Sequence, residues 1–312
     1  MMNYKKVFIT GATGFIGSHI CESLVKEGYE VSVIVRKTSN LSFIKDLNIK
    51  IYYGDLLDKE SLKEPIKEVN YVIHCAGQIL GKKEDYYQVN YLGTKNLIDN
   101  ILELKPPLKL FIHLSTIAAC GPGENIKEDK ELCPLSDYGK TKLLSENLLL
   151  EYANKIPLII LRLSAIYGPR DKETLKYFKI LKKKIGLVFG GSFSLCYVKD
   201  LTHLITSILK NNKEIKSGEI FNIADGNCYN FKDIVDAYEK ITNDKVLKIY
   251  LPNFLVFLIG YLWQRDKIKD LTAKCYLVDI EKAKNILGFN PKYSLIEGLK
   301  ETLDWYKNNN WL

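Results

Sequence analysis

The sequence lacks the patterns that mark zinc sites and disulfide frameworks. Its seven cysteines are scattered, odd in number and never spaced as C-x-x-C, and its four histidines show no ligand spacing. We therefore expect no metal, and cysteines that are reduced packing residues. His74 and His113 end apolar runs, where hydrogen-bonded core imidazoles are expected.

Concentrated basic charge is also missing. The net charge of +8 arises from dispersed lysines, and no aromatic-interleaved basic stripe is present, so we expect no nucleic-acid partner. The chain runs from its first residues straight into an apolar strand, which leaves no room for a signal peptide. This start favours a cytoplasmic protein.

Long apolar runs are absent too. The most apolar stretch, 254–263, is too short to span a bilayer, so we expect no transmembrane segment. A buried helix or a subunit contact is the simplest interpretation. The alternatives are an apolar lid over a hydrophobic substrate and a peripheral membrane contact.

The 312 residues, 46% of them hydrophobic, alternate between apolar strands and helical segments as far as about residue 161. This alternation predicts an α/β fold with a Rossmann-type, doubly wound parallel sheet. The predicted strands are 5–10, 30–35, 49–53, 70–75, 108–114 and 157–161. Beyond 169 the pattern loosens into helices near 172–184, 198–211, 231–242, 280–287 and 295–308, with short strands near 187 and 219.

We therefore assign 1–169 to a dinucleotide-binding domain. A smaller, mostly helical substrate domain occupies 170–312, with parts near 195–225 returning to the first domain. Ligands bind beyond the carboxyl ends of the strands in such sheets, so the loops there should converge on one crevice.

A glycine-rich turn joins the first strand to the first helix and has the sequence Gly11-Ala12-Thr13-Gly14-Phe15-Ile16-Gly17. Glycines at this spacing let the backbone approach a pyrophosphate, and the new helix directs its free N–H groups and positive dipole end at the charge. A glycine turn can be only a turn, but its place in the first strand-helix unit predicts dinucleotide binding.

The second strand ends at Arg36, where an NAD-selective fold usually presents a carboxylate to the ribose 2′-hydroxyl. A guanidinium there can bind a 2′-phosphate, so we favour NADP(H), with NAD(H) as the alternative. Arg36 can also be simply exposed. Asp55 closes the third strand and can accept a bond from adenine or cap the next helical segment.

Chemistry is best placed at Tyr138 and Lys142, which lie one helical turn apart on the same face. A nearby ammonium lowers the pKa of a phenol and makes it a usable acid or base. The preceding strand ends in Ser115 and Thr116, which brings a hydroxyl to the same crevice.

Motifs along nearly the whole chain resemble the extended short-chain dehydrogenase/reductase family, also called the NAD-dependent epimerase/dehydratase family. They are Gly11-x-x-Gly14-x-x-Gly17, Asp55-Leu56, His74-Cys75-Ala76-Gly77, Asn90-x-x-Gly93-Thr94, Ser115-Thr116, Tyr138-x-x-x-Lys142, Tyr167-Gly168-Pro169, Val198-x-Asp200 and Leu287-Gly288-Phe289-x-Pro291. In detail they are most similar to dihydroflavonol reductase-like and 3β-hydroxysteroid dehydrogenase-like members.

The resemblance implies Tyr138 as acid/base, Lys142 as the cation that holds the nicotinamide ribose, and Thr116, or alternatively Ser115, as the hydroxyl bound to the substrate oxygen. Cofactor contacts are expected at Gly11, Thr13, Gly14, Phe15, Ile16, Gly17, Arg36, Asp55, Leu56, Cys75, Ala76, Gly77, Asn90, Lys142 and Ala165.

Departures from the family pattern bear on the substrate. Sugar dehydratases of the family carry Asp-Glu after the catalytic threonine, where this chain has Ile117-Ala118, so dehydration is not expected. Ala165 and Phe193 occupy places where nucleotide-sugar epimerases present an asparagine and an arginine to the substrate diphosphate. Lys199 or Arg170 can compensate.

We therefore expect an NAD(P)-dependent oxidoreductase that transfers hydride between nicotinamide C4 and a ketone or secondary alcohol. The alternatives are a nucleotide-sugar 4-epimerase with tightly bound NAD and a non-catalytic cofactor-binding protein. The partner is a small molecule. The helices near 85–104 and 136–154 can form a homodimer interface.

Overall fold

The computed structural model describes residues 5–211, 215–263 and 265–312, and the chain divides into two compact units. Unit 1 contains Met1–Ala119, Asp137–Arg162 and Thr202–Phe221. Unit 2 contains Cys120–Ser136, Leu163–Leu201 and Asn222–Leu312. The assignment of cofactor and substrate roles to 1–169 and 170–312 stays a prediction.

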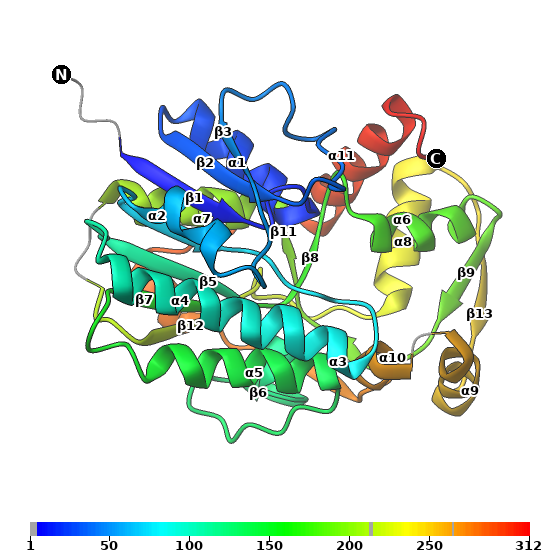
Figure 1. Cartoon of the computed structure of the whole chain (residues 1–312). Coiled ribbons are helices and arrows are strands. Elements are labelled where there is room, and N and C mark those ends of the chain that lie inside the picture. Colours follow the sequence, from blue (N-terminus) through cyan, green and yellow to red (C-terminus); the bar gives the residue numbers. More distant parts are fainter. Residues whose placement is uncertain (1–4, 212–214, 264) are drawn as a thin grey trace. The chain divides into compact units, whose positions relative to one another are not determined.

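A seven-stranded sheet with the order β12-β7-β5-β4-β1-β2-β3 forms the centre of unit 1 (Figure 1). β1 pairs in parallel with β2 and β4, β2 with β3, and β4 with β5. The order winds outward in both directions from β1, which confirms the predicted Rossmann-type sheet. The strands are β1 Lys6–Thr10, β2 Glu30–Val35, β3 Lys50–Tyr53, β4 Tyr71–His74, β5 Leu110–Thr116, β7 Leu158–Leu163 and β12 Glu219–Ile223.

Helices cover both faces of this sheet. On one face α1 and α7 are joined by a hydrogen bond between the Ser23 and Thr206 hydroxyls and by a Glu27–Lys210 ion pair. On the other face α4 and α5 run side by side (Figure 1). The helical elements are α1 Phe15–Lys26, η1 Glu60–Leu62, α2 Lys63–Ile66, α3 Lys83–Tyr86, η2 Tyr87–Leu92, α4 Gly93–Leu104, η3 Ile117–Ala119, α5 Asp137–Leu150 and α7 Val198–Asn211.

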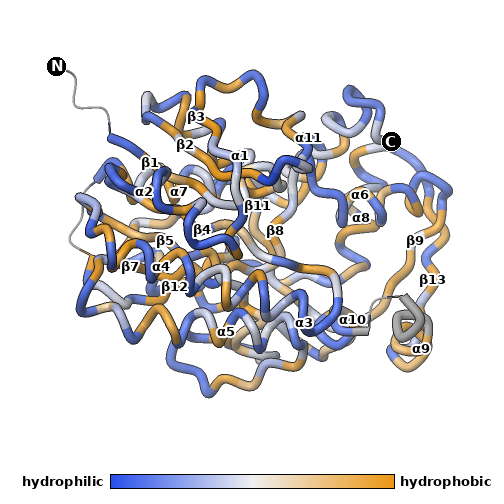
Figure 2. The backbone as a smooth tube through the Cα atoms, in the orientation of Figure 1, coloured by the Kyte–Doolittle hydropathy of each residue, from blue (hydrophilic) through white to orange (hydrophobic). Residues whose placement is uncertain are grey.

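The core of unit 1 follows from the apolar strands. Phe8, Val72 and Phe111 point from three neighbouring strands to the same face of the sheet, where Leu97 and Leu149 of the covering helices meet them. All five are fully buried. Strands that are apolar on both faces need helices on both faces, and Figure 2 shows these strands mostly in orange.

Unit 2 contains three small sheets with the strand orders β10-β14-β6, β11-β8 and β13-β9. Their strands are β6 Gly123–Ile126, β8 Ala165–Tyr167, β9 Ile185–Val188, β10 Ser192–Phe193, β11 Leu195–Tyr197, β13 Leu247–Tyr250 and β14 Cys275–Val278. The sequence predicted one of these beyond residue 169, the strand near 187. The others are two to four residues long, too short for a periodic pattern.

Four predicted helices of unit 2, near 172–184, 231–242, 280–287 and 295–308, are present, whereas the helix Arg265–Leu271 was not predicted. Three of the helices begin at recognisable caps. Asp171, Asn230 and Ser294 each accept hydrogen bonds from backbone N–H groups in the first turn of the helix that follows. The helices are α6 Lys172–Leu181, α8 Phe231–Thr242, α9 Asn253–Trp263, α10 Arg265–Leu271, η4 Ala283–Leu287 and α11 Leu295–Asn308.

Candidate active site

The glycine turn after β1 forms a cradle that only glycine fits. Gly11 has φ +72°, and a Cβ on it would lie 2.7 Å from the backbone nitrogen of Ala76. A Cβ on Gly17 would lie 2.3 Å from the carbonyl oxygen of Gly11. The turn therefore packs closely against both the following helix and the end of β4. Because glycine has no side chain, a ligand can approach the backbone of the turn directly.

α1 begins directly after this turn, with Gly14 as its N-cap, no side-chain cap and no acidic residue in its first turn. Thr13, Phe15 and Ile16 lie in the same junction. A helix start without its own anionic cap leaves N–H groups and the positive dipole end for an external anion. The junction therefore fits a pyrophosphate.

A buried polar chain supports the cradle from behind. His74 Nδ1 lies 2.7 Å from the Thr10 hydroxyl, and His74 Nε2 lies 2.9 Å from the Thr94 hydroxyl. The Thr10 hydroxyl also accepts a bond from the backbone N–H of Ala76 at 3.2 Å. Burial, with a smaller effect of Lys142, lowers the pKa of His74 to about 3, so the imidazole stays neutral. The predicted core imidazole is confirmed.

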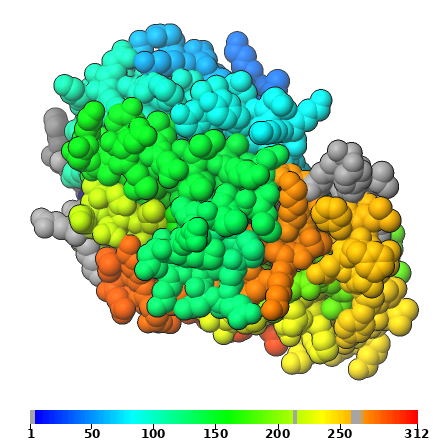
Figure 3. All heavy atoms as spheres, turned by 90° about the horizontal axis from the view of Figure 1, so that it is seen from below, coloured from blue at the N-terminus to red at the C-terminus, as the bar shows by residue number. Residues whose placement is uncertain are grey.

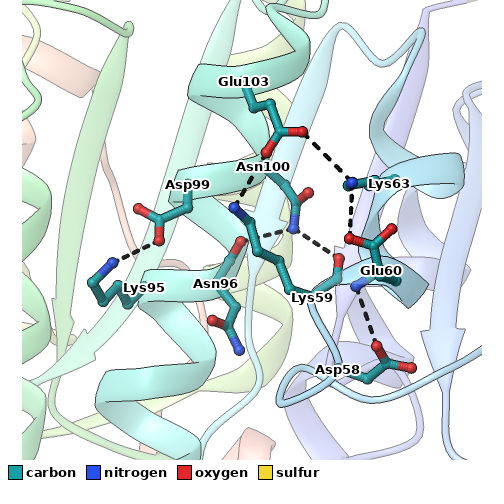
Figure 4. Close-up of polar contacts among 9 residues, drawn as sticks. All are labelled: Asp58, Lys59, Glu60, Lys63, Lys95, Asn96, Asp99, Asn100 and Glu103. Carbon is teal, nitrogen blue, oxygen red and sulfur yellow. Dashed lines mark hydrogen bonds and ion pairs between the residues drawn. The ribbon is translucent and has the colours of Figure 1, made fainter.

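The segment after β3, which contains Asp55 and Leu56, is held by two asparagines of α4, and Figure 4 shows the contact of one of them, Asn100, with Lys59. Asn96 Nδ2 donates to the Leu56 carbonyl at 2.9 Å, and Asn100 Nδ2 donates to the Lys59 carbonyl at the same distance. Ion pairs of Lys59 and Lys63 with Glu103 add to this contact. The Asp55 carboxylate accepts from the backbone N–H of Leu57 at 2.9 Å in a local turn, whereas the helical segment η1 begins at Glu60, whose N–H is bound by Asp58.

Arg36 follows directly after β2 and is exposed to solvent. Its backbone N–H donates to the Ser39 hydroxyl at 3.2 Å. Arg36 thus lies at the carboxyl end of β2, which pairs with β1, the strand that leads into the glycine turn. This is the position from which it can reach an adenosine ribose.

Asn90 links the end of β4 to α5. Its side chain accepts from the backbone N–H of Gln78 at 2.7 Å and donates to the Thr141 hydroxyl at 3.1 Å. Its carbonyl accepts from the Thr94 and Ser145 hydroxyls. Asn90 lies in the π-turn η2, an irregularity that often marks a functional position in a helix. Cys75, Ala76 and Gly77 lie directly before the Gln78 contact.

Tyr138 and Lys142 lie one turn apart on α5. The Tyr138 ring meets the Tyr86 ring edge to face at 6.2 Å. Lys142 is 3% exposed, and its Nζ donates to the Leu114 carbonyl at 2.8 Å and lies 3.2 Å from His113 Nε2. Burial lowers the pKa of Lys142 to about 8, although the Glu146 carboxylate acts in the opposite direction.

Ser115 and Thr116, which the sequence left as alternatives, have different surroundings. The buried Ser115 hydroxyl donates to Glu146, whose carboxylate is paired with Arg162. The Thr116 hydroxyl lies on the opposite face of β5, is half-buried and accepts from the backbone N–H of Ala118 at 3.2 Å. Within the described part of the chain its hydroxyl hydrogen has no acceptor, which favours Thr116.

The predicted residues of the cradle and of α5 belong to unit 1, whereas Ala165 belongs to unit 2. Ala165 is the exposed first residue of β8. Phe193 lies in an aromatic cluster of unit 2, with its ring 5.3 Å from Phe231, which stacks on Phe189 at 4.2 Å. Phe193 therefore makes aromatic contacts at the place where an arginine was expected of nucleotide-sugar epimerases.

Sequence reasoning missed the buried partners Glu146 and Arg162, and it missed the contact of His113 with Lys142. A signal for Glu146 was present, because it stands one helical turn after Lys142. Across the described ranges, no group of His, Cys, Asp and Glu is arranged to hold a metal ion. No helix within the same ranges is long and apolar enough to cross a membrane.

Comparison with known proteins agrees with this geometry. Residues 7–224 match the sequence model of the NAD dependent epimerase/dehydratase family. The chain belongs to this family. It is of the extended short-chain dehydrogenase/reductase type and is therefore an NAD-dependent enzyme of the oxidoreductase class. This confirms both the family resemblance and the function class that the sequence predicted.

Two curated family members extend over almost the whole chain. UDP-glucose 4-epimerase of Vibrio cholerae is 28% identical and covers 96% of this chain and 94% of its own length. The decarboxylating sterol-4-alpha-carboxylate 3-dehydrogenase of Dictyostelium discoideum is 26% identical over 95% of this chain and 99% of its own length.

A solved structure of the family shares the fold. UDP-glucuronic acid 4-epimerase from Bacillus cereus, in complex with UDP-glucuronic acid and NAD, has a TM-score of 0.82 and 27% sequence identity. The alignment covers 97% of this chain and 99% of that chain. The proteins to which the chain is similar therefore include both UDP-sugar 4-epimerases and a sterol-4-alpha-carboxylate 3-dehydrogenase.

Proposed function

We propose that this enzyme is an NAD(P)-dependent oxidoreductase of a ketone or secondary alcohol, with Tyr138 as acid/base. The observation that carries this proposal is the setting of Lys142. Its ammonium is buried one turn from Tyr138 and fixed by the Leu114 carbonyl. A buried, oriented cation beside a tyrosine supports a role at a ligand site, because perturbed ionisable groups cluster at functional sites.

The residues divide the work as follows. The glycine cradle would hold the pyrophosphate, and Lys142 would bind the nicotinamide ribose. When bound, the nicotinamide supplies or accepts a hydride at C4. Tyr138 donates a proton to the carbonyl oxygen during reduction or accepts it from the alcohol during oxidation, and the positive charge of Lys142 makes this transfer easier. Thr116 donates a hydrogen bond that orients the same oxygen.

Three positions guide the choice of substrate. Ile117 and Ala118 provide neither acid nor base for water elimination. Ala165 and Phe193 provide no charge for a diphosphate, and Phe193 instead packs with Phe231. A diphosphate without charge-assisted partners loses several favourable hydrogen bonds, so these positions support an apolar carbonyl compound.

For the cofactor we propose a preference for NADP(H). Arg36 and the adjacent Lys37 are exposed at the end of β2, where a carboxylate would favour NAD(H). The Bacillus cereus relative binds NAD, so NAD(H) is the competing cofactor. We also propose a homodimer through α5 and the helical stretch near 85–104 that contains η2 and α4, where Leu144 of α5 and Tyr87 of η2 are exposed.

The competing function is a nucleotide-sugar 4-epimerase, which the Vibrio cholerae relative favours. An epimerase returns the hydride to the same substrate, so its cofactor is regenerated in every cycle and is kept bound. A reductase exchanges its cofactor with the solution.

The two functions are separated by following the cofactor. The purified enzyme is tested for retained dinucleotide, and loss of reduced-nicotinamide absorbance is measured with a panel of apolar ketones, in parallel with UDP-sugar epimerisation. We expect exchange and net NADPH consumption, with Tyr138→Phe as the inactive control. Tightly retained NAD and UDP-sugar epimerisation without net oxidation would establish the competing function.

A further inference from the structure

The neutral imidazole of His74 lies in a chain of hydrogen bonds whose direction follows from the number of hydrogens available. The Thr94 hydroxyl has a single hydrogen and donates it to the Asn90 carbonyl at 2.6 Å. Its oxygen therefore accepts from His74 Nε2, which lies 2.9 Å away. His74 thus carries its proton on Nε2, and its Nδ1 accepts from the Thr10 hydroxyl at 2.7 Å.

One end of this chain reaches the glycine turn. The Thr10 hydroxyl, which donates to His74, accepts from the backbone N–H of Ala76 at 3.2 Å. Gly11 packs on this same residue, since a Cβ on Gly11 would lie 2.7 Å from the Ala76 nitrogen. The orientation of the Thr10 hydroxyl therefore fixes backbone that borders the predicted pyrophosphate site.

The other end of the chain reaches α5 through the buried Asn90. The Asn90 carbonyl accepts from the Ser145 hydroxyl at 2.6 Å, and Asn90 Nδ2 donates to the Thr141 hydroxyl at 3.1 Å. Thr141 in turn donates to the Tyr138 carbonyl at 2.9 Å. Figure 3 shows the green residues of α5 at the surface, so this helix faces solvent on one side while Asn90 holds it from within.

His113 lies beside His74, with 5.2 Å between the ring centroids, and has the opposite pattern. Its Nε2 lies 3.2 Å from Nζ of Lys142, and an ammonium group can donate but not accept. His113 Nε2 is therefore an acceptor, and the proton of this neutral imidazole lies on Nδ1. The two neighbouring imidazoles thus carry their protons on different nitrogens.

We propose that His74 is a positioning residue, whose single tautomer holds Asn90, and through it α5, in a fixed position relative to the glycine turn. If the tautomer were reversed, Thr94 would have to release Asn90 and Thr10 would need another acceptor, so the chain is stable in one direction. The proposal rests on the proposed function, because it takes Tyr138 of α5 as the acid/base. The competing epimerase reaction uses the same residue.

The tautomers are measured first, by NMR of the imidazole nitrogens, which needs neither substrate nor cofactor. The chain has four histidines, so His19→Gln with His203→Gln leaves two imidazoles in the spectrum. We expect His74 to be protonated on Nε2 and His113 on Nδ1. Thr94→Val should move the proton of His74 toward Nδ1 and leave His113 unchanged. Two imidazoles with the same tautomer, or a spectrum that Thr94→Val does not alter, would overturn the proposal.

Turnover is then compared in Thr94→Val, which removes the hydroxyl with little change in shape, and in Thr94→Ser, which retains it. We expect kcat of Thr94→Val to fall roughly threefold to tenfold, the effect of one lost hydrogen bond on the position of α5. The Kd for the dinucleotide should change less, because Thr10 keeps its contact with Ala76. Thr94→Ser should restore the wild-type kcat.

The matched control is Thr302→Val in unit 2. Thr302 is as fully buried as Thr94, and its hydroxyl also donates to a carbonyl four residues earlier, that of Gly298, at 2.6 Å. Thr302→Val should lose similar stability in thermal unfolding and keep kcat. An unchanged kcat in Thr94→Val would reduce His74 to a packing residue. Failure of the proposed function is distinguishable, since it would leave the expected tautomers in a wild type that turns over neither ketones nor UDP-sugars.

Discussion

Arg162 of β7 and Glu146 of α5 form a fully buried ion pair, in which guanidinium Nη2 lies 2.7 Å and Nε 3.0 Å from Oε2 of the carboxylate. The Ser115 hydroxyl donates to the same carboxylate. The pair therefore fixes the face of α5 that lies one turn beyond Lys142, and it joins this helix to two strands of the sheet.

Removing one partner of this pair should destabilise the enzyme strongly. Glu146→Gln or Arg162→Met leaves an unpaired buried group, so each should lower the free energy of unfolding by about 3–5 kcal/mol. The double variant should lose less than the sum of the two, which chemical denaturation measures. Additive losses would show that the two side chains act independently.

Thr116 and Ser115 should respond differently to removal of their hydroxyls. Thr116→Ala or Thr116→Val is expected to lower kcat/KM by about tenfold or more with little change in stability, because it removes a hydrogen bond to the substrate oxygen. Ser115→Ala is expected to lower stability by about 1–3 kcal/mol, because Glu146 loses a buried donor. Steady-state kinetics and thermal unfolding on both variants check this, and the opposite assignment of losses would move the substrate hydroxyl to Ser115.

The sequence predicted the sheet and the glycine turn well, because these features leave local traces. Alternating apolar strands and helices report a parallel sheet, and the cradle requires glycine at Gly11 and Gly17 for steric reasons. The sequence could not decide which of Ser115 and Thr116 faces the substrate, because a shift of one residue along a strand moves a side chain to the opposite face of the sheet.

Long-range partners were out of reach of local patterns. Arg162 and Glu146 are sixteen residues apart and meet only after α5 packs on the sheet. The contacts of Asn96 and Asn100 with the segment after β3 span forty and forty-one residues. The short strands of unit 2 depend on such contacts, which explains why they were missed.

The activity should fall as pH rises through the pKa of Lys142. The ammonium form binds the ribose and assists Tyr138, and burial lowers the pKa of Lys142 to about 8. The ammonium fraction therefore decreases above about pH 8, and kcat/KM for the cofactor, which reports the free enzyme, should decrease with it. Glu146 raises this pKa, so a folded Glu146→Gln variant should show the decline at lower pH.

His113, which contacts Lys142, offers a second test of this pH dependence. Burial lowers its pKa well below the ordinary value, so the imidazole is neutral where the enzyme works. His113→Gln retains an acceptor for Lys142 and should keep the wild-type profile more closely than His113→Leu. If the pH profile of kcat/KM is unchanged in Glu146→Gln, His113→Leu and Lys142→Arg, the decline does not arise from Lys142.

Arg36 should decide between the two nicotinamide cofactors. Arg36→Ala removes a charge-assisted contact to the 2′-phosphate, worth about 1.5–3 kcal/mol, so the Kd for NADPH should rise roughly tenfold to a hundredfold. The Kd for NADH should change little, because its ribose carries a hydroxyl there. Arg36→Asp should go further and favour NADH, since a carboxylate accepts from the 2′-hydroxyl and repels the phosphate.

Lys67→Ala, which removes an exposed cation elsewhere on unit 1, is the control for general electrostatic attraction. Titration of cofactor fluorescence gives both constants. Tighter binding of NADH than of NADPH by the wild type, or equal losses for both cofactors in Arg36→Ala, would limit Arg36 to stacking on the adenine and leave NAD(H) as the working cofactor.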